Sequence, residues 1–329
     1  MKTIIGNNML SKINTMFDFS RFSKILILTD SNVSKNWLTA IKRSIRQKTD
    51  EIIIKAGENE KNIETVKIIW QKMFDIRLDR QSLLINLGGG VVCDMGGFVA
   101  GTYMRGIDYI QVPTTLLSQV DASIGGKTGF NLGGIKNSIG LFNQPKLVLI
   151  DVGMLSTLPR REYISGFAEI IKHGIIADKN YFQLVTAKKP NEYSKIEMMK
   201  IIEGSCRIKS KIVRQDEKEA GLRKILNFGH TIGHALEAIS INLTNPLSHG
   251  EAISIGMVAE SWLAMKLHIL SEHEFSLIEQ SIKAIGLPIR AQNISPNKMM
   301  KCIAHDKKNS GHILEWSIPE AIHYITNTP

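Results

Sequence analysis

Three histidines lie close together in the second half of the chain, within the stretch GHTIGHALEAISINLTNPLSHGE (229–251). His230 and His234 are four positions apart, so on a helix they would lie on one face, one turn apart. His249 follows an expected Asn-Pro turn that would let the chain fold back toward the pair. Catalytic zinc usually has three protein ligands, often histidines, and one open position. The stretch therefore predicts either a metal site or ordinary hydrogen-bonded histidines.

The first two histidines match only part of the zinc-protease motif H-E-x-x-H. Thr231 follows His230, so the glutamate that activates water in that motif is absent. Either these histidines serve a different metal chemistry, or some of them bind no metal.

Three consecutive glycines, Gly88 to Gly90, end an apolar run and precede an expected helix. Glycines at such a turn let a pyrophosphate approach the backbone and face the helix N-terminus. The stretch does not match the dinucleotide motif G-x-G-x-x-G, because Cys93 occupies its last glycine position. Both a nucleotide site and a tight structural turn remain open.

Polar residues follow other apolar runs: Asp30 follows the first, Glu58 and Lys61 the second, and Thr114 and Thr115 a later one. Each could instead serve a turn or a helix cap. Ligands of open α/β sheets collect at the carboxyl ends of the strands, so we expect these groups to converge on one dinucleotide.

Residues 119–140 (QVDASIGGKTGFNLGGIKNSIG) combine six glycines with two lysines and an aspartate. The segment shows neither helical nor strand periodicity, so we expect a loop that wraps around a ligand. Lys127 and Lys136 could bind phosphate as point charges; ordinary surface lysines are the alternative.

The elements that must position these residues change in kind along the chain. Short runs rich in Ile, Leu and Val alternate with helical stretches in the first half, as in an α/β domain with a parallel sheet. Helices dominate after about Ser156, which predicts domains at 1–155 and 156–329. The expected strands are 24–30, 51–57, 82–90, 109–116 and 147–151, and the clearest helices are 62–76, 160–176, 192–213 and 250–270.

The composition is that of an ordinary globular protein: 329 residues, 43% hydrophobic and 22% charged. Three scattered cysteines give neither a disulfide framework nor a thiolate zinc site. No signal-peptide core or membrane-length apolar run is present, so we expect a cytoplasmic protein. The net charge is +10, but the basic residues do not alternate with aromatic residues in any run. This pattern favours anionic small ligands over nucleic acid.

Four long motifs carry a family resemblance that runs from about Thr29 to Gly311. The segments GGGVVCDMGGFVAGTYMRGIDYIQVPTTLLSQVDASIGGKTGFN, SGFAEIIKHGII, LRKILNFGHTIGHALEA and LSHGEAISIGM resemble 3-dehydroquinate synthases, the shikimate-pathway cyclases. The resemblance implies a Rossmann-like NAD-binding domain, a helical domain that binds zinc or cobalt and substrate, and an active site in the cleft between them. It also implies a homodimer.

The resemblance assigns roles by motif. The metal ligands would be Glu169, His230 and His249, and His234 would face the substrate instead. Proton handling and other catalytic work would fall to His234, Lys127, Lys172, Arg223 and Asn227. The substrate, the seven-carbon keto acid phosphate DAHP, would contact Arg105 (from the neighbouring subunit), Asp121, Lys127, Asn137, Lys172, Lys209, Arg223, Asn227, His234 and Lys307. NAD would contact Asp30, Asn32, Glu58, Lys61, Gly89, Gly90, Asp94, Thr114, Thr115, Lys136, Thr157 and Leu158.

One segment departs from the family pattern. Many members read N-H-P-x-G-K-N where this chain has NLGGIKN (131–137). Lys136 and Asn137 keep their spacing, but the missing His and Pro change the stiffness expected of residues 131–135.

The implied reaction loses phosphate and closes a ring without net redox change. It comprises transient oxidation of the C5 alcohol, phosphate elimination, re-reduction and an intramolecular aldol step. Alternatives are a cyclase acting on sedoheptulose 7-phosphate or glucose 6-phosphate, a metal-dependent polyol dehydrogenase, and a non-enzymatic remnant. Lys127, Lys209 and Arg223 favour a carboxylated substrate.

Overall fold

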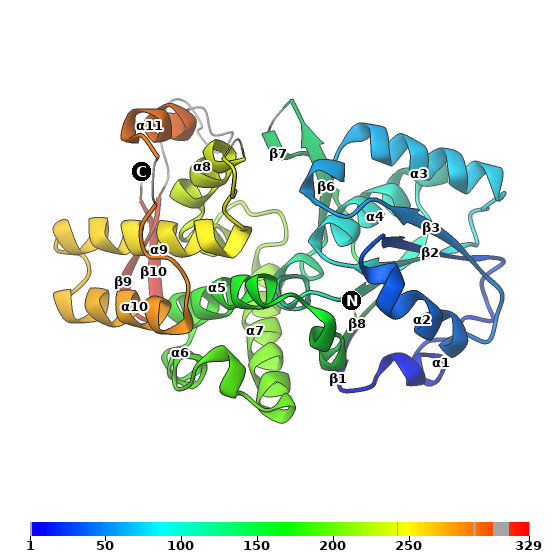
Figure 1. Ribbon diagram of the computed structural model, residues 1–329, viewed down its shortest axis with the longest axis horizontal. Helices are drawn as coiled ribbons and strands as arrows, with labels where there is room; N and C mark the ends of the chain where they lie inside the picture. Colours follow the sequence, from blue (N-terminus) through cyan, green and yellow to red (C-terminus); the bar gives the residue numbers. More distant parts are fainter. Residues whose placement is uncertain (1, 134, 242, 292–293, 305–315, 329) are drawn as a thin grey trace. The chain divides into compact units, whose positions relative to one another are not determined.

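The computed structural model describes residues 2–133, 135–241, 243–291, 294–304 and 316–328. The chain divides into two compact units, Met1–Pro159 and Arg160–Pro329, which are described separately. The expected fold class is confirmed, with a parallel sheet in the first unit and mainly helices in the second (Figure 1).

A six-stranded parallel sheet forms the centre of the first unit, in the order β1-β8-β5-β4-β2-β3. All five predicted strands are present, and β1 was not foreseen. The strands are β1 (Lys2–Gly6), β2 (Ile25–Asp30), β3 (Thr49–Ile54), β4 (Leu83–Gly88), β5 (Asp108–Pro113) and β8 (Leu147–Asp151).

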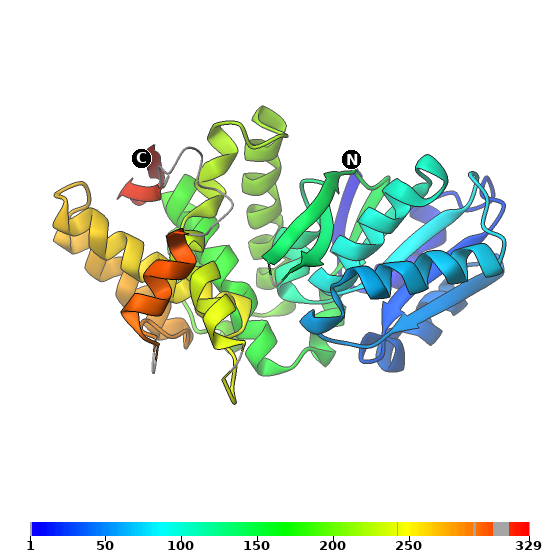
Figure 2. The same ribbon diagram turned by 90° about the horizontal axis from the view of Figure 1, so that it is seen from above.

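Helices cover both faces of this sheet, which is why its strands are apolar on both sides (Figures 1 and 2). Successive residues of β2 point to opposite faces, so Leu26 and Leu28 belong to one core cluster and Ile25 and Ile27 to the other. Side chains of α3 (Ile63–Asp75) and α4 (Gly90–Thr102) belong to the first cluster. Side chains of α1 (Ile13–Met16) and α2 (Thr39–Ser44) belong to the second.

The strand order reverses direction between β2 and β4. The chain continues from β2 to β3 on one side, and from β4 to β5 on the other. The crevice at the carboxyl ends of two such strands is the usual ligand site of an open α/β sheet.

The expectation of a wrapping loop at residues 119–140 is wrong. The structure has a π-helical turn (Ser118–Ala122) and an antiparallel hairpin of β6 (Lys127–Leu132) and β7 (Ile135–Phe142). A Cβ on Gly129 would lie 2.2 Å from the Ile139 carbonyl oxygen. Glycine therefore permits close strand contact here, and the glycine content had suggested loop freedom instead.

The second unit is built on α5 (Arg160–Ala177) and α9 (His249–Lys266), whose middle turns are almost entirely buried. Around them lie α6 (Lys179–Thr186), α7 (Lys195–Gln215), α8 (His230–Ser240), α10 (Glu272–Ile285) and α11 (Pro296–Ala304) (Figures 1 and 2). A hairpin of β9 (Trp316–Ala321) and β10 (Tyr324–Thr328) was not predicted. Among the described residues, no helix is both long and apolar enough to cross a membrane.

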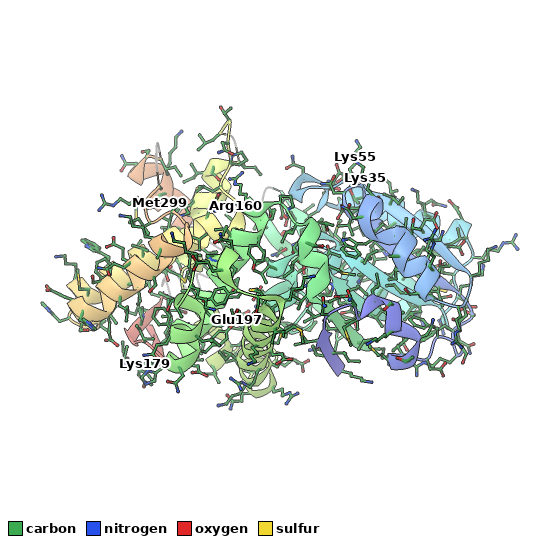
Figure 3. The ribbon with its side chains drawn as sticks, turned by 60° about the horizontal axis from the view of Figure 1, so that its bottom comes forward. Lys35, Lys55, Arg160, Lys179, Glu197 and Met299 are labelled. Carbon is green, nitrogen blue, oxygen red and sulfur yellow. The ribbon has the colours of Figure 1, made fainter. Side chains whose placement is uncertain are left out.

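The surface carries its positive charge without concentrating it in one unit. Lys35 and Lys55 are exposed on the first unit, and Arg160 and Lys179 on the second (Figure 3). The expectation that this charge does not serve nucleic-acid binding stays a prediction.

Candidate active site

Helices α8 and α9 approach each other closely at the start of α8. Gly229 has a φ of +77°, and a Cβ on it would lie 2.5 Å from Met257 Cγ. A Cβ on Gly256 would lie 2.0 Å from the Gly229 carbonyl oxygen. The buried Glu260 carboxylate accepts the Gly229 N–H at 2.6 Å, where a negative charge also complements the helix dipole. These contacts place His230 in the first turn of α8.

Three side chains from three helices point their ligand atoms at one another. Glu169 of α5 is fully buried, and its Oε1 lies 3.7 Å from His230 Nε2 and 3.4 Å from His249 Nε2. The three ligand atoms all lie within 4.8 Å of one another. Ligands on tetrahedral zinc, with bonds of about 2.0–2.1 Å, are about 3.3 Å apart. The separations therefore fit a metal ion.

The imidazole of His230 is oriented for metal binding. Its Nδ1 lies 3.1 Å from the Phe228 carbonyl oxygen. A ring nitrogen that donates to a carbonyl leaves the lone pair on the other nitrogen, here Nε2, for a cation. The nitrogen that faces Glu169 is thus the one able to act as a ligand.

The charge around these donors also suits a cation. Burial opposes protonation of His249, but the carboxylates of Glu237 and Glu169 outweigh it and raise the pKa of His249 to about 10. Lys172 forms a buried ion pair with Glu169. A donor set that attracts a proton and an ammonium group this strongly fits a divalent metal.

His234 lies beside the three predicted ligands. Its ring centroid is 5.1 Å from that of His230 and 6.5 Å from that of His249. Its assignment to substrate binding and proton handling stays a prediction.

Three buried cations belong to helices that pack against one another. Lys172 lies on α5, Lys209 on α7 and Arg223 on the 3-10 helix Leu222–Asn227. They are 1%, 6% and 2% exposed. Cations are rarely buried to this extent without partners. Lys172 is paired with Glu169, and Arg223 Nη1 donates to the Glu217 carbonyl oxygen. Their assignment to an anionic substrate stays a prediction.

A loop bonded to Asp216 leads into that 3-10 helix. The Asp216 carboxylate accepts the N–H groups of Gly221, Arg223 and Ala220, and these bonds lower its pKa. Asn227 donates to Glu219 Oε1 at 3.0 Å. Sequence reasoning missed Asp216 and Glu219, since neither belongs to a recognisable ligand spacing.

In the first unit, the glycine turn lies at the reversal of strand order. Gly89 precedes α4, which has no side-chain cap at its N-terminus. A Cβ on Gly90 would meet Ala122 Cβ only at 3.7 Å, so the backbone here remains approachable. Unpaired N–H groups at a helix start attract phosphate, so the turn fits the pyrophosphate of a dinucleotide.

Other predicted cofactor contacts follow the neighbouring strand ends. Asp30 ends β2, and its Oδ1 accepts the N–H groups of Asn32 and Val33. Thr115 Oγ1 bonds Ser118 Oγ at 2.9 Å. Thr114 Oγ1 is buried and has no hydrogen-bond partner among the described residues, so a ligand could use it. The Thr114 N–H donates to the Gly88 carbonyl oxygen at 2.9 Å, and a Cβ on Gly89 would lie 3.0 Å from Thr115 Cγ2. The role of these residues in cofactor binding stays a prediction.

Asn131 joins three predicted site residues and was missed by the sequence reasoning. Its side chain donates to Glu58 Oε1 at 2.9 Å and accepts the Asn137 N–H at 2.8 Å, while its own N–H donates to the Lys61 carbonyl. Lys61 Nζ is paired with Asp94 at 2.5 Å. Burial raises the pKa of Asp94 in spite of this lysine.

The remaining predicted residues of the first unit lie on several other elements. Arg105 is exposed and has a φ of +71°, directly after Met104 at +48°. Two successive non-glycine residues in this strained region point to a constrained position. The Thr157 hydroxyl accepts from Trp37 Nε1 at 2.9 Å. Lys127 and Lys136 lie on the β6–β7 hairpin, Asp121 lies on the π-helical turn, and Leu158 is half-buried. Lys307, a predicted substrate contact of the second unit, lies outside the described residues.

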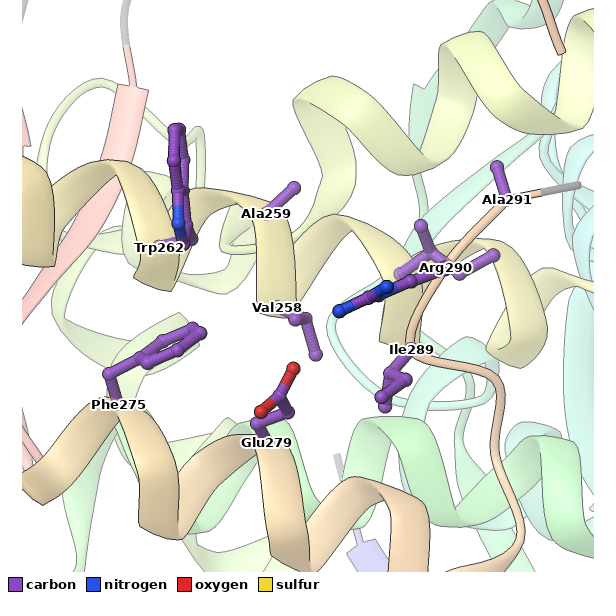
Figure 4. A pocket seen from close by; sticks show the side chains of 9 residues that line it. Val258, Ala259, Trp262, Phe275, Glu279, Ile289, Arg290 and Ala291 are labelled. Carbon is purple, nitrogen blue, oxygen red and sulfur yellow. The ribbon is translucent and has the colours of Figure 1, made fainter. Parts of the chain in front are cut away.

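A separate hollow of about 350 Å³ lies between α9, α10 and residues 289–291 (Figure 4). It is lined by Trp262 and Phe275 and, at one side, by Glu279 and Arg290. None of its lining residues is among the predicted site residues.

Family models match most of the chain. The 3-dehydroquinate synthase N-terminal model matches residues 51–165, and the C-terminal model of the same family matches residues 166–309. The chain belongs to the 3-dehydroquinate synthase family.

Known 3-dehydroquinate synthases are similar over most of their length. The protein of Alkaliphilus metalliredigens is 44% identical over 90% of this chain and 83% of the relative. That of Ruminiclostridium cellulolyticum is 40% identical over 94% of this chain and 86% of the relative.

Related cyclases share the fold of this 3-dehydroquinate synthase family member. The 2-epi-5-epi-valiolone synthase of Streptomyces hygroscopicus, solved with NAD⁺ and Zn²⁺, has a TM-score of 0.90 at 25% identity, covering 99% of this chain and 92% of its own. A 2-deoxy-scyllo-inosose synthase, solved with NAD⁺, Co²⁺ and carbaglucose-6-phosphate, has a TM-score of 0.88 at 25% identity, covering 98% and 90%. A probable glycerol dehydrogenase of Sinorhizobium meliloti, at 15% identity, a TM-score of 0.67 and coverage of 94% and 90%, shares the fold alone.

Proposed function

We propose that this chain converts DAHP to 3-dehydroquinate and phosphate, as a carbon-oxygen lyase of the shikimate pathway. The observation that carries the proposal is the buried Glu169 carboxylate, which faces the Nε2 atoms of two histidines. The family membership of the chain and its relatives of 40–45% identity support the same activity.

Glu169, His230 and His249 would hold a Zn²⁺ or Co²⁺ ion. The metal would polarise the substrate's hydroxyl and carbonyl oxygens and lower the pKa of the alcohol. Glu169 would contribute the negative charge of the site, and the Phe228 carbonyl would keep His230 Nε2 directed at the ion.

The substrate's two anionic groups call for cations. Lys209 and Arg223 would bind carboxylate or phosphate oxygens, and the same role is proposed for Lys127 and Asn137. The Lys172 ammonium group would neutralise the charge of the Glu169 carboxylate. Its other N–H groups would donate hydrogen bonds to the substrate. The same cations disfavour a neutral polyol substrate.

His234 would exchange a proton with the C5 hydroxyl, next to Asn227. If so, His234→Ala should keep its metal and lose turnover. Loss of the metal in that variant would make His234 a ligand instead.

The first unit would bind NAD at the reversal of its strand order. When bound there, NAD⁺ would supply reversible hydride transfer with the substrate alcohol, so that no net redox change results. The α4 N-terminus would hold the pyrophosphate and Asp30 a ribose hydroxyl, while Thr114 would offer its buried hydroxyl.

We also infer a homodimer in which Arg105 reaches the substrate phosphate of the neighbouring subunit. The constrained backbone at Met104 and Arg105 supports a fixed orientation for this exposed side chain. The three free cysteines agree with a reducing compartment, and we expect the cytoplasm.

One assay separates the candidate functions. Purified protein with NAD⁺, Zn²⁺ or Co²⁺ and DAHP should release phosphate and form 3-dehydroquinate in equal amounts, without accumulating NADH. Turnover of sedoheptulose 7-phosphate or glucose 6-phosphate in place of DAHP would identify another cyclase. Stoichiometric NADH without phosphate release would identify a polyol dehydrogenase.

A further inference from the structure

A second carboxylate lies behind the predicted metal ligands. Glu237 is on α8, seven residues after His230, so the two side chains share a face of the helix. Its side chain is 3% exposed, and its Oε2 lies 3.5 Å from His249 Nδ1. Glu237 lies in the motif LRKILNFGHTIGHALEA, but no role was predicted for it.

The two nitrogens of the His249 ring face two different carboxylates. Nε2 faces Glu169 Oε1 at 3.4 Å, and Nδ1 faces Glu237 Oε2 at 3.5 Å. A metal held by Glu169 and His249 Nε2 is therefore on the other side of the ring from Glu237. This arrangement places Glu237 behind a ligand and does not make it a ligand itself.

The position of His249 explains why such a partner is needed. His249 is the first residue of α9 and follows an irregular segment. Arg161 ties that segment down by donating to the Pro246 carbonyl at 2.6 Å and to both oxygens of Glu251. These contacts hold the backbone, and the orientation of the imidazole still depends on what its Nδ1 meets.

We propose that Glu237 is a positioning residue that accepts the Nδ1–H of His249 and so directs Nε2 to the metal. The inference rests on the proposed metal site. A carboxylate behind a histidine ligand selects the ring tautomer and raises the basicity of the ligating nitrogen. For His230 the Phe228 carbonyl occupies the corresponding position, so the two histidines are held by different acceptors.

Burial of Glu237 argues that it has this partner role. A buried carboxylate without a hydrogen-bonding or charged partner is costly, and an apolar residue would pack at such a position without that cost. The acid Glu237 instead faces the Nδ1 of His249. The Nδ1 of the other predicted histidine ligand, His230, faces a backbone carbonyl.

The test compares Glu237→Ala and Glu237→Gln with a matched core variant, Leu236→Ala. Leu236 is the neighbouring residue of α8 and is 1% exposed, so its truncation destabilises α8 without removing a carboxylate. Each full-length protein is titrated with Co²⁺ against a chelator, and the visible absorption spectrum of the bound ion is recorded.

Glu237→Ala should weaken Co²⁺ binding about 10- to 100-fold and shift the visible bands. Glu237→Gln, which keeps an acceptor oxygen, should lose less affinity than Glu237→Ala. Leu236→Ala should bind Co²⁺ with the wild-type affinity and spectrum once its folded fraction is taken into account.

Wild-type Co²⁺ affinity and an unchanged spectrum in both Glu237 variants would overturn the inference, as would equal losses in Glu237→Ala and Leu236→Ala. If Glu237→Ala does not fold, the comparison of Glu237→Gln with the wild type decides. These outcomes are independent of DAHP turnover: a wild-type protein that binds Co²⁺ but releases no phosphate contradicts the proposed function and leaves this test valid.

Discussion

The candidate metal centre of the second unit and the candidate dinucleotide site of the first are built in different ways. At the metal centre, side chains from α5, α8 and α9 point at one another, and a buried carboxylate faces two imidazoles. At the dinucleotide site, the ends of parallel strands and the start of α4 bring backbone groups and short side chains to one edge of a sheet.

The difference predicts how each site responds to change. The metal centre depends on a few charges and on close helix packing, so single substitutions should alter both metal binding and folding. The dinucleotide site depends on topology, so a substitution there can weaken binding while the fold persists.

The largest expected effect is the loss of the carboxylate at the metal centre. Glu169→Ala removes a proposed ligand and leaves Lys172 buried without its anion. We expect Co²⁺ affinity to fall by more than about 100-fold. Mutation of a residue that only supports a ligand already lowers metal affinity by about 10- to 100-fold. Equilibrium dialysis followed by metal analysis measures this, and full metal content in the variant would refute the ligand assignment.

The same substitution made in both sites tests the comparison directly. Gly229→Ala puts a Cβ 2.5 Å from Met257 Cγ at a φ of +77°, so it should destabilise the fold by about 2–3 kcal/mol. A Cβ on Gly90 meets only Ala122 Cβ, at 3.7 Å. Gly90→Ala should therefore change the free energy of unfolding by less than about 1 kcal/mol.

Gly90→Ala should nevertheless bind NAD⁺ about tenfold more weakly, since a Cβ stands where the pyrophosphate approaches the backbone. Urea unfolding and NAD⁺ titration measure the two effects. Equal destabilisation by both substitutions would remove the distinction between the sites.

The Lys61–Asp94 pair tests whether the first unit also depends on charge. Lys61 is 5% exposed, so Lys61→Met leaves the Asp94 carboxylate without its partner and should cost about 2–4 kcal/mol near neutral pH.

The pH dependence of that loss has a definite sign. The folded-state pKa of Asp94 is already raised, chiefly by burial, and loss of the lysine raises it further. The protonated acid is neutral, so the deficit of Lys61→Met should shrink as the pH falls through this raised pKa and grow above it. Unfolding curves across the acid range measure this, and a deficit that does not change with pH would contradict it.

The smallest effect concerns the cysteines. Burial raises the pKa of the Cys93 thiol, in the first unit, and raises that of Cys206, in the second, to about 12. Only the partly exposed Cys302 should therefore react rapidly with a thiol reagent in the native protein. Rapid modification of Cys93 or Cys206 would show that its unit opens more readily than the packing indicates.

Much of the fold was predictable because apolar runs and helical periodicity determine elements locally. The predicted strand 147–151 has the same bounds as β8, and helix 62–76 differs from α3 by one residue at each end. The hairpin at residues 127–142 was missed because its glycines, which allow close strand contact, read in the sequence as loop residues.

The sites were predictable only in part. His230 and His234 attract attention through their spacing, but Glu169 is distant in sequence, and only the family resemblance linked it to them. Glu237 could have been found as the residue two helical turns after His230, whereas Asp216 and Asn131 act through backbone contacts that no spacing reveals.

The most direct test of the central claim is a crystal structure of the zinc-loaded protein with anomalous data at the zinc edge. One strong peak is expected within about 2.0–2.2 Å of a Glu169 oxygen and of the Nε2 atoms of His230 and His249, with His234 beyond bonding distance. A peak coordinated by His234, or one that does not include Glu169, would contradict it.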